Sequence, residues 1–464
     1  MMKDTKYIFP AFSFYDRTGI QEFLEKKARD GWMLEKMGGL TWKFRRIEPK
    51  KVHFAVTYFP KASAFDPAPS EQQEMFNEFC AHSGWNLAAS SAQLQIFCNE
   101  QENPVPIETD PEIELENIHK TAKKIYLPAY YMLLPVGILP WLTISMTWRN
   151  DPVSFLATNI YFYNILTSVI DLLLCGTELF GYYRWRAKAK RAAADGEFVP
   201  TRGRRYFQIA LVVLMVACLA ILAFNFADMH ISLMMLATLL LLCMTIAASV
   251  GATKLMKKMK VPARTNKIIT YVLIGVLSLA ATGLGTFGVV AALNEWNQKE
   301  KDLPTYEFHG ETWTLYQDEI PLKVQDLTEA EPEVYSYHES YSSESLLVKV
   351  QDFYQRPRFD RLDQPDIQYT IVGVKADFLY DFCLNTMLEA RKDAWSEDIY
   401  GNITYDEYRQ VDAAPWSADA AYQEYNGEEA LDQYLLCYGN LIIELNPDWE
   451  LTADQMAAVG AVFR

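Results

Sequence analysis

The sequence predicts a multidomain membrane protein with three parts: an N-terminal α+β domain, a helical transmembrane bundle and a C-terminal α+β domain. Five long apolar stretches fill the middle of the chain. A pattern that contains Gly-Trp occurs twice before them, and an acidic segment rich in strand-forming residues follows them. Residues 296–464 carry 34 acidic and 12 basic residues, whereas residues 1–295 carry 25 acidic and 31 basic residues. This asymmetry indicates parts that work in different surroundings.

The repeat lies in the N-terminal part, residues 1–115, which we expect in the cytosol. Residues 22–46 and 75–99 align on the Gly-Trp step, and a helix-like run precedes each glycine. Glycine closes a helix in the left-handed conformation without a Cβ clash, and the large Trp then begins a strand. With another strand before each helix, the order βαββαβ predicts a ferredoxin-like domain with one antiparallel sheet. The residues expected to form this structural motif are Gly31, Trp32, Gly84, Trp85 and Trp42.

This part of the chain also resembles the domain of unknown function 2812 family, over roughly residues 8–60. The positions that carry the resemblance are Tyr15, Asp16, Gly19, Leu24, Ala28, Gly31, Trp32, Leu34, Trp42, Phe44, Glu48, Pro49 and Tyr58. The resemblance implies a multi-pass membrane protein of Firmicutes. Because the family has no assigned activity, the resemblance implies no catalytic residue, and its glycines and aromatics look structural.

Five apolar stretches predict transmembrane helices within residues 116–295. They run at about Ile125–Trp148, Phe155–Tyr183, Phe207–Phe226, Ile231–Thr253 and Ile268–Leu293. Each is near or above the roughly 20 residues that a helix needs to cross about 30 Å of hydrocarbon. Prolines at positions 128, 135 and 140 leave open that one of the first two stretches is re-entrant.

Basic residues in alternate loops predict the orientation in the cell membrane. The loops at about residues 184–205 and 254–267 contain eight and six Lys or Arg, whereas the other two loops contain only Arg149. Short loops rich in Lys and Arg stay in the cytoplasm, so we expect the N-terminus inside and the C-terminus outside. The basic residues either set topology alone or also hold anionic lipid headgroups. The residues concerned are Arg184, Arg186, Lys188, Lys190, Arg191, Lys254, Lys257 and Lys258.

Two acidic residues lie in the second apolar stretch. Asp171 and Glu178 are seven residues apart, which places them on one face of a helix. An acid within a membrane is costly and indicates a functional site, here a relay for protons or cations. The structural alternative is that Glu178 reaches toward Arg184 and Arg186, while Asp171 bonds a polar side chain of a neighbouring span.

Residues 296–464 predict an extracytoplasmic α+β domain. Several strand-like runs accompany a hairpin turn at Gly439-Asn440 and a terminal helix capped by Thr452, with Gln455 three residues on. An amphipathic helix is expected at residues 377–393. Cys383 and Cys437 are predicted either to form a disulfide or to stay as free buried thiols.

The sequence lacks the motifs that are typical of several enzyme classes. The sequence contains no HExxH, GxSxG, Walker or kinase motif, and its seven Cys show no CxxC. We therefore expect no catalytic residues, no cofactor and no metal site. Nucleic-acid binding is not expected either, because the basic residues flank apolar stretches and no DNA-binding motif accompanies them.

These observations predict a non-enzymatic sensor or regulator in the membrane. The outer domain is expected to bind an envelope ligand or protein, and the N-terminal domain a cytosolic protein. A homo-oligomer is compatible with this prediction. The alternative is a transport or channel component that uses Asp171 and Glu178.

Overall fold

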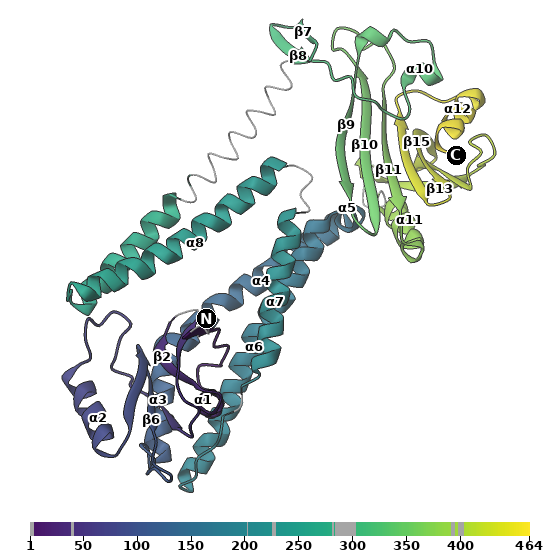
Figure 1. Ribbon diagram of the computed structural model, residues 1–464. Coiled ribbons are helices and arrows are strands. Elements are labelled where there is room, and N and C mark those ends of the chain that lie inside the picture. Colours follow the sequence, from purple (N-terminus) through teal and green to yellow (C-terminus); the bar gives the residue numbers. More distant parts are fainter. Residues whose placement is uncertain are drawn as a thin grey trace. The chain divides into compact units, whose positions relative to one another are not determined.

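The computed structural model describes residues 4–38, 41–201, 203–224, 229–280, 283, 303–390, 395–397 and 403–464. The chain folds as two compact units (Figure 1). The first unit contains residues 1–140 and 165–289, and the second contains residues 141–164 and 290–464.

The first unit begins with two βαββ modules. The first module contains β1 (Thr5–Ile8), α1 (Arg17–Arg29), β2 (Trp32–Met37) and β3 (Trp42–Arg46). The second contains β4 (His53–Tyr58), α2 (Glu71–His82), β5 (Asn86–Ser91) and β6 (Leu94–Asn99). Each module forms its own three-stranded antiparallel sheet, in the orders β1-β3-β2 and β4-β6-β5.

The predicted ferredoxin-like βαββαβ domain with a single sheet is therefore wrong. Each repeat holds one strand more than expected, because the chain turns back at Gly38 and forms β3 after β2. That additional strand pairs inside its own module, so each module closes a small sheet by itself. The two sheets meet where β2 and β5 lie near each other.

One face of α1 provides the core of this domain. Ile20, Leu24 and Ala28 recur every four residues, which places them on one side of the helix, and all three are buried. They belong to one apolar cluster with Phe44 and Phe54 from the two sheets.

Long helices follow the two modules. Helix α3 (Pro111–Thr121) continues through a π-helical turn (Ala122–Tyr126) into α4 (Leu127–Asn150). Helix α6 (Asn159–Ala194) runs back along α4, because Tyr131 lies beside Tyr183 and Gly137 lies beside Ser168. The unit also contains α7 (Arg205–Phe224), α8 (Met229–Lys258) and a helix at residues 263–280.

Two helices in the described part of the chain are long and apolar enough to cross a membrane, and the prediction of about five spans is wrong there. The two are Pro111–Asn150, which includes α3 and α4, and α6. The third predicted stretch, Phe207–Phe226, begins inside α7, whose described part is an apolar helix, and its last two residues lie outside the described part of the chain. The fourth predicted stretch, Ile231–Thr253, lies within α8, and the fifth, Ile268–Leu293, lies partly outside the residues that the structure describes.

The second unit is built on one large antiparallel sheet. Its eight strands follow the order β12-β13-β14-β15-β16-β11-β10-β9. Their bounds are β9 Tyr335–Glu344, β10 Val348–Pro357, β11 Ile367–Val374, β12 Trp395–Glu397, β13 Ile403–Val411, β14 Ala420–Asn426, β15 Glu429–Tyr438 and β16 Leu441–Pro447. A separate hairpin contains β7 (Thr305–Phe308) and β8 (Glu311–Thr314). The expected α+β domain is thus dominated by its sheet.

Short helices surround this sheet. They are α5 (Pro152–Ala157), α10 (Val324–Leu327), α11 (Tyr380–Glu389) and α12 (Ala453–Phe463), with 3-10 turns at Pro332–Val334 and Asp377–Leu379. Helix α12, drawn in yellow in Figure 1, contributes Val459 and Phe463 to the core beneath Tyr369 and Trp416.

Several local predictions for this region are confirmed. Strands β15 and β16 turn at Gly439-Asn440, and α11 lies inside the predicted helix. Thr452 and Gln455 form the expected capping box at the start of α12. Of the two outcomes left open for the cysteines, the structure shows Cys383 and Cys437 as free and buried.

Candidate functional site

Helix α6 places the two predicted acids in different surroundings. Glu178 is 5% exposed, and Asp171 lies two turns earlier on the same helix. No hydrogen bond within the described part of the chain joins the two carboxylates. The structure therefore does not bring them together as one relay.

Glu178 is the centre of a buried polar cluster. Ser13 Oγ donates a 2.8 Å hydrogen bond to Glu178 Oε1, and Tyr126 OH donates a 2.5 Å bond to Oε2. Ser13 Oγ in turn accepts a 3.2 Å bond from Gln208 Nε2 of α7. The predicted pairing of Glu178 with nearby arginines is not the observed contact. Instead, one carboxylate of α6 joins the segment before α1 to the π-helical turn before α4, and Ser13 links it to α7.

The N-terminus of α1 forms the second part of this contact. Asp16 caps the helix by accepting a hydrogen bond from Gly19 N at 3.0 Å, and it also accepts one from Gly203 N at 2.8 Å. A Cβ atom at Gly203 would lie 2.5 Å from Asp16 Oδ2, so only glycine fits there without a shift. Burial raises the pKa of Asp16, and the two backbone hydrogen bonds oppose this by stabilising its charged form.

Two threonines bind the same two segments reciprocally. Thr18 N donates to Thr201 Oγ1 at 2.9 Å, and Thr201 N donates to Thr18 Oγ1 at 3.0 Å. The segment between α6 and α7 is thereby held against the start of α1. These contacts satisfy backbone donors that would otherwise be orphaned at the beginning of a helix.

Aromatic rings cover the polar cluster. Tyr15 stacks on Trp185 with ring centroids 5.4 Å apart and meets Tyr182 edge-on at 5.5 Å. Phe14 stacks on Tyr126 at 5.4 Å. Tyrosines and tryptophans at the ends of apolar helices are typical of membrane interfaces. Here Tyr126, Tyr182 and Trp185 instead contact the N-terminal domain.

Asp171 occupies a small space between α4 and α6. Its Oδ2 atom has no hydrogen-bond partner in the described structure, and Cys175 Sγ lies 3.9 Å from Oδ1. A Cβ at Gly137 of α4 would lie 2.7 Å from Asp171 Oδ2, so glycine makes room for the carboxylate. Asp171 is thus a half-buried acid whose Oδ2 atom lacks a polar partner in the described structure.

The predicted Gly-Trp motif forms in both modules, with different roles for the two Trp. Gly31 and Gly84 have φ of 82° and 83°, in the left-handed region that closes α1 and α2. Trp32 is half-buried beneath basic side chains, whereas Trp85 is buried and donates from Nε1 to Val105 O at 2.7 Å. Trp42 lies in β3 within the main core.

The basic candidates are arranged differently from the prediction. Arg184, Arg186, Lys188, Lys190 and Arg191 lie on α6, which continues to Ala194 through what was expected to be a loop. Lys254, Lys257 and Lys258 form the last turns of α8. Their predicted contact with lipid headgroups stays a prediction. Cations in the last turns of a helix are also favoured by its dipole.

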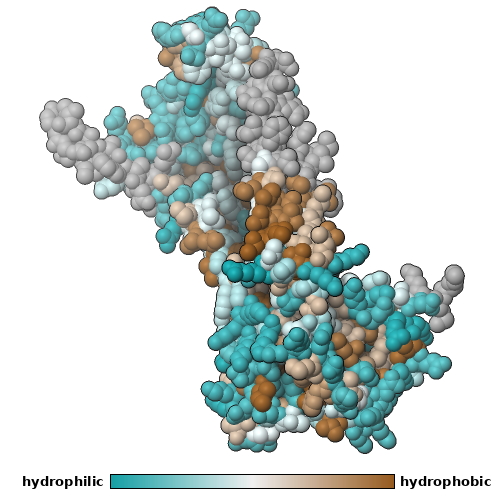
Figure 2. Space-filling view, turned by 90° about the vertical axis from the view of Figure 1, so that its left-hand side faces the viewer, coloured by the Kyte–Doolittle hydropathy of each residue, from teal (hydrophilic) through white to brown (hydrophobic). Residues whose placement is uncertain are grey.

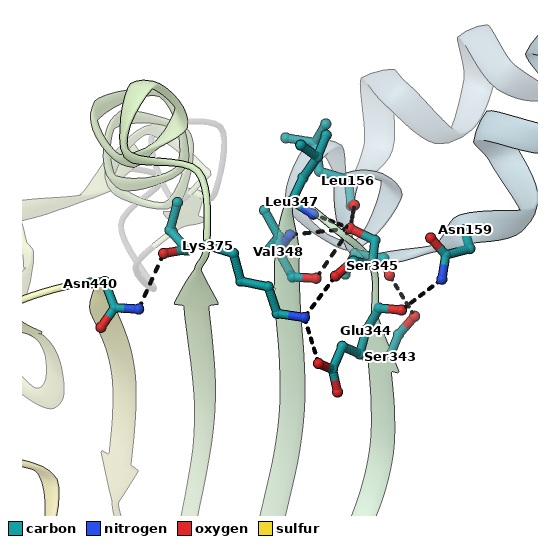
Figure 3. A network of polar contacts seen from close by, with 11 residues as sticks. Leu156, Asn159, Ser343, Glu344, Ser345, Leu347, Val348, Lys375 and Asn440 are labelled. Atoms are coloured by element: carbon teal, nitrogen blue, oxygen red, sulfur yellow. Dashed lines mark hydrogen bonds and ion pairs between the residues drawn. The ribbon is translucent and has the colours of Figure 1, made fainter. Parts of the chain in front are cut away.

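In the second unit, the segment that joins α4 to α6 is fixed to the sheet. Ser345 Oγ donates to Leu156 O at 2.7 Å, and Asn159 Nδ2 donates to Glu344 O at 3.0 Å (Figure 3). Lys375 pairs with Glu344 and donates to Ser345 O at 2.8 Å, which fixes the same strand end (Figure 3).

Aromatic stacking adds to this attachment. Trp148, near the end of α4, stacks on Phe382 of α11 with ring centroids 5.5 Å apart. Its other neighbour is Phe155 of α5, which it meets edge-on at 5.4 Å. The end of α4, the connecting segment and the beginning of α6 therefore belong to the second unit.

The contacts described above were not visible in the sequence. Ser13 and Glu178 are separated by 165 residues, and Asn159 and Glu344 by 185 residues. The resemblance over residues 8–60 contained Tyr15, Asp16 and Gly19, which are now seen at this contact.

Comparison with known proteins gives one match. No curated protein and no solved structure matches the chain. Residues 16–130 match the model of a family described as protein of unknown function (DUF2812). The match begins just before α1 and includes the rest of the first module, the whole second module, the linker, α3 and the beginning of α4, but not β1. It confirms the resemblance and identifies residues 16–130 as the DUF2812 region of this chain.

Proposed function

We propose that this chain is a membrane protein without enzymatic activity, in which α4 and α6 couple the sheet domain to the DUF2812 region. The two helices meet the length and composition needed for crossing a bilayer. Their outward side chains are apolar, for example Met132, which is 78% exposed, and Met146, which is 65% exposed. Figure 2 shows hydrophobic side chains gathered on the surface of the helical part. Such a surface is stable in lipid and costly in water.

The observation that carries the proposal is that both units share these helices. The division between the units falls inside α4, after Pro140, and inside α6, after Asn164. In the first unit, Glu178 of α6 accepts hydrogen bonds from Ser13 and Tyr126. In the second unit, the end of α4 stacks on the sheet domain. A displacement of the sheet domain would therefore act on helices that also hold the DUF2812 region.

The distribution of charge supports a proposed orientation of the chain in the membrane. Lys and Arg on the last turns of α6 and α8 favour the cytoplasmic side, and the proposal places the DUF2812 region there. The acidic sheet domain is proposed to lie outside the cell and to receive an envelope ligand or protein. The DUF2812 region is proposed to contact a cytosolic protein.

Hydrogen exchange tests the coupling in the full chain reconstituted in lipid nanodiscs. Trp148→Ala removes the stacking on Phe382, and we expect faster exchange in the distant segment 13–18. Trp141→Ala is the matched control, because Trp141 is exposed on the same helix and has no stacking partner among the described rings. Unchanged exchange at residues 13–18 in Trp148→Ala would contradict the proposed coupling.

A second function is favoured by one observation, the unpartnered Oδ2 of Asp171. A half-buried acid with an unpartnered carboxylate oxygen on an apolar helix is suited to a proton or cation pathway. In this alternative, the chain is a transport component and Glu178 is the next acid along α6. Asp171→Asn is expected to abolish ion flux into vesicles, and an unchanged flux would dismiss the alternative.

A further inference from the structure

A cavity of about 360 Å³ lies inside the DUF2812 region. Its walls come from α1, from β4 and from the linker at residues 102–108. Its volume lies at the lower end of the range that small-molecule sites occupy. The cavity is separate from the Glu178 cluster, and its walls belong to one compact unit.

The linker is held in place as a wall. Trp85 lines the cavity and donates from Nε1 to Val105 O at 2.7 Å. Pro104 and Pro106 flank this contact and stiffen the segment, since proline fixes φ. The apolar lining of the cavity therefore includes Trp85, Ile107 and the two prolines.

Three polar atoms of residues that line the cavity lack hydrogen-bond partners in the described structure. Thr57 of β4 is 3% exposed, and its hydroxyl has no hydrogen-bond partner in the described structure. The same is true of His53 Nε2 and of Arg17 Nε. Native structures satisfy almost all such groups, with water or a ligand where protein does not reach them. Three of them around one cavity indicate that a polar molecule belongs there.

The charges around the cavity have both signs. Arg17 supplies a cation, and its terminal nitrogen pairs with Glu114 while Nε stays unpartnered. Glu25, whose Oε1 lies 3.9 Å from His53 Nδ1, and Glu108 supply carboxylates. Burial and the neighbouring Glu114 raise the pKa of Glu108 to about 8, although Arg17 opposes the shift. A positive group inside the cavity would relieve this unfavourable environment.

We propose that the cavity binds a zwitterionic α-amino acid with an apolar side chain. The carboxylate of the amino acid would accept from Arg17 Nε and the Thr57 hydroxyl, and its ammonium group would meet Glu25 and Glu108. The apolar side chain would lie against Trp85 and Ile107. This inference goes beyond the proposed function and does not depend on it, because every group involved lies in the DUF2812 region.

Isothermal titration of the full chain in detergent tests the ligand class with three matched probes. L-leucine carries both charges, 3-methylbutylamine lacks the carboxylate, and 4-methylpentanoate lacks the ammonium group. We expect L-leucine to bind and each single-charge probe to bind at least about tenfold more weakly, since a missing partner leaves a buried group unpaired. No heat from L-leucine, or equal affinity for a single-charge probe, would overturn the proposal.

Variants then test the residues. Thr57→Val and Glu25→Gln are each expected to weaken L-leucine binding about tenfold. Glu35→Gln is the matched control, because Glu35 is an exposed glutamate of the same domain that pairs with Lys43 outside the cavity. Thr57 is buried, so Thr57→Val is used only if its thermal unfolding resembles that of the parent chain. Glu25 is only half-buried, so Glu25→Gln tests the site without replacing a fully buried side chain. Unchanged affinity in Glu25→Gln would contradict the assignment.

Discussion

Replacement of Ser13 by Ala isolates the contact between the segment before α1 and helix α6. Ser13 is 4% exposed, donates to Glu178 Oε1 at 2.8 Å and accepts from Gln208 Nε2 at 3.2 Å. Alanine keeps the backbone and removes only the hydroxyl. Glu178 then retains Tyr126 as a donor, while Glu178 Oε1 loses its donor and Gln208 Nε2 loses its acceptor.

The expected loss of stability follows from this geometry. Removal of one partner from a buried hydrogen bond costs about 1–3 kcal/mol, with higher values when the remaining group is charged. A change of about 1 kcal/mol shifts Tm by roughly 2–4 °C for domains of about 150–250 residues. We therefore expect the Tm of the first unit to fall by roughly 2–12 °C.

Thermal unfolding of the full chain in detergent measures this loss. Ser90→Ala is the matched control, because Ser90 is exposed on β5 of the same domain, and its Tm is expected to stay within about 1 °C of the parent, since exposed substitutions have small effects. Tyr126→Phe removes the other donor to Glu178. Because both donors share one carboxylate, the double variant is expected to depart from additivity by about 0.5 kcal/mol or more. A Tm for Ser13→Ala that equals the Ser90→Ala value would refute the reasoning.

Three further predictions concern other parts of the fold. Gly31→Ala is expected to lower Tm more than Gly196→Ala: both glycines have positive φ, but a Cβ at Gly31 would also meet a backbone carbonyl at 3.0 Å, whereas Gly196 has open space. Equal losses would contradict a steric role at Gly31. Glu108 has a pKa of about 8 when folded and an ordinary value of 4.5, so the folded state holds its proton across that range and stability falls as pH rises from about 4.5 to 8. Glu108→Gln should flatten the dependence of Tm on pH in this window, and an unchanged profile would rule the assignment out. In the second unit, Gly460→Ala places a Cβ 2.1 Å from Trp416 O, so we expect α12 to shift and limited proteolysis to release it, whereas the parent chain resists.

The sequence predicted the local structure of the N-terminal domain better than its topology. Helix termination at Gly31 and Gly84 follows from backbone sterics, which act over a few residues. The single sheet was wrong because the Gly38-Gly39 turn was not taken as a hairpin signal, although it separates two strand-like runs.

Long-range contacts limit how much of the helices and of the candidate site can be predicted from the sequence. Apolar length identifies α4 and α6, but it does not show how far each helix continues, and α6 extends through a segment expected to be a loop. Glu178 was predicted to be a functional residue because an acid is costly within an apolar stretch. Its two buried hydrogen bonds show how the carboxylate is accommodated there. Its partner Ser13 could not be predicted from the sequence. Nothing in the sequence distinguishes this serine from the others, and only the fold brings it to the carboxylate.

Protease treatment of intact spheroplasts tests the central claim most directly, namely that α4 and α6 hold the two domains on different sides of a membrane. The loop at residues 358–366 of the sheet domain contains Arg358 and Arg361, which are potential trypsin sites with partly exposed side chains. We predict cleavage there, together with survival of an N-terminal fragment that still contains the linker at residues 102–108. Loss of the linker in sealed spheroplasts, or protection of residues 358–366, would contradict the account.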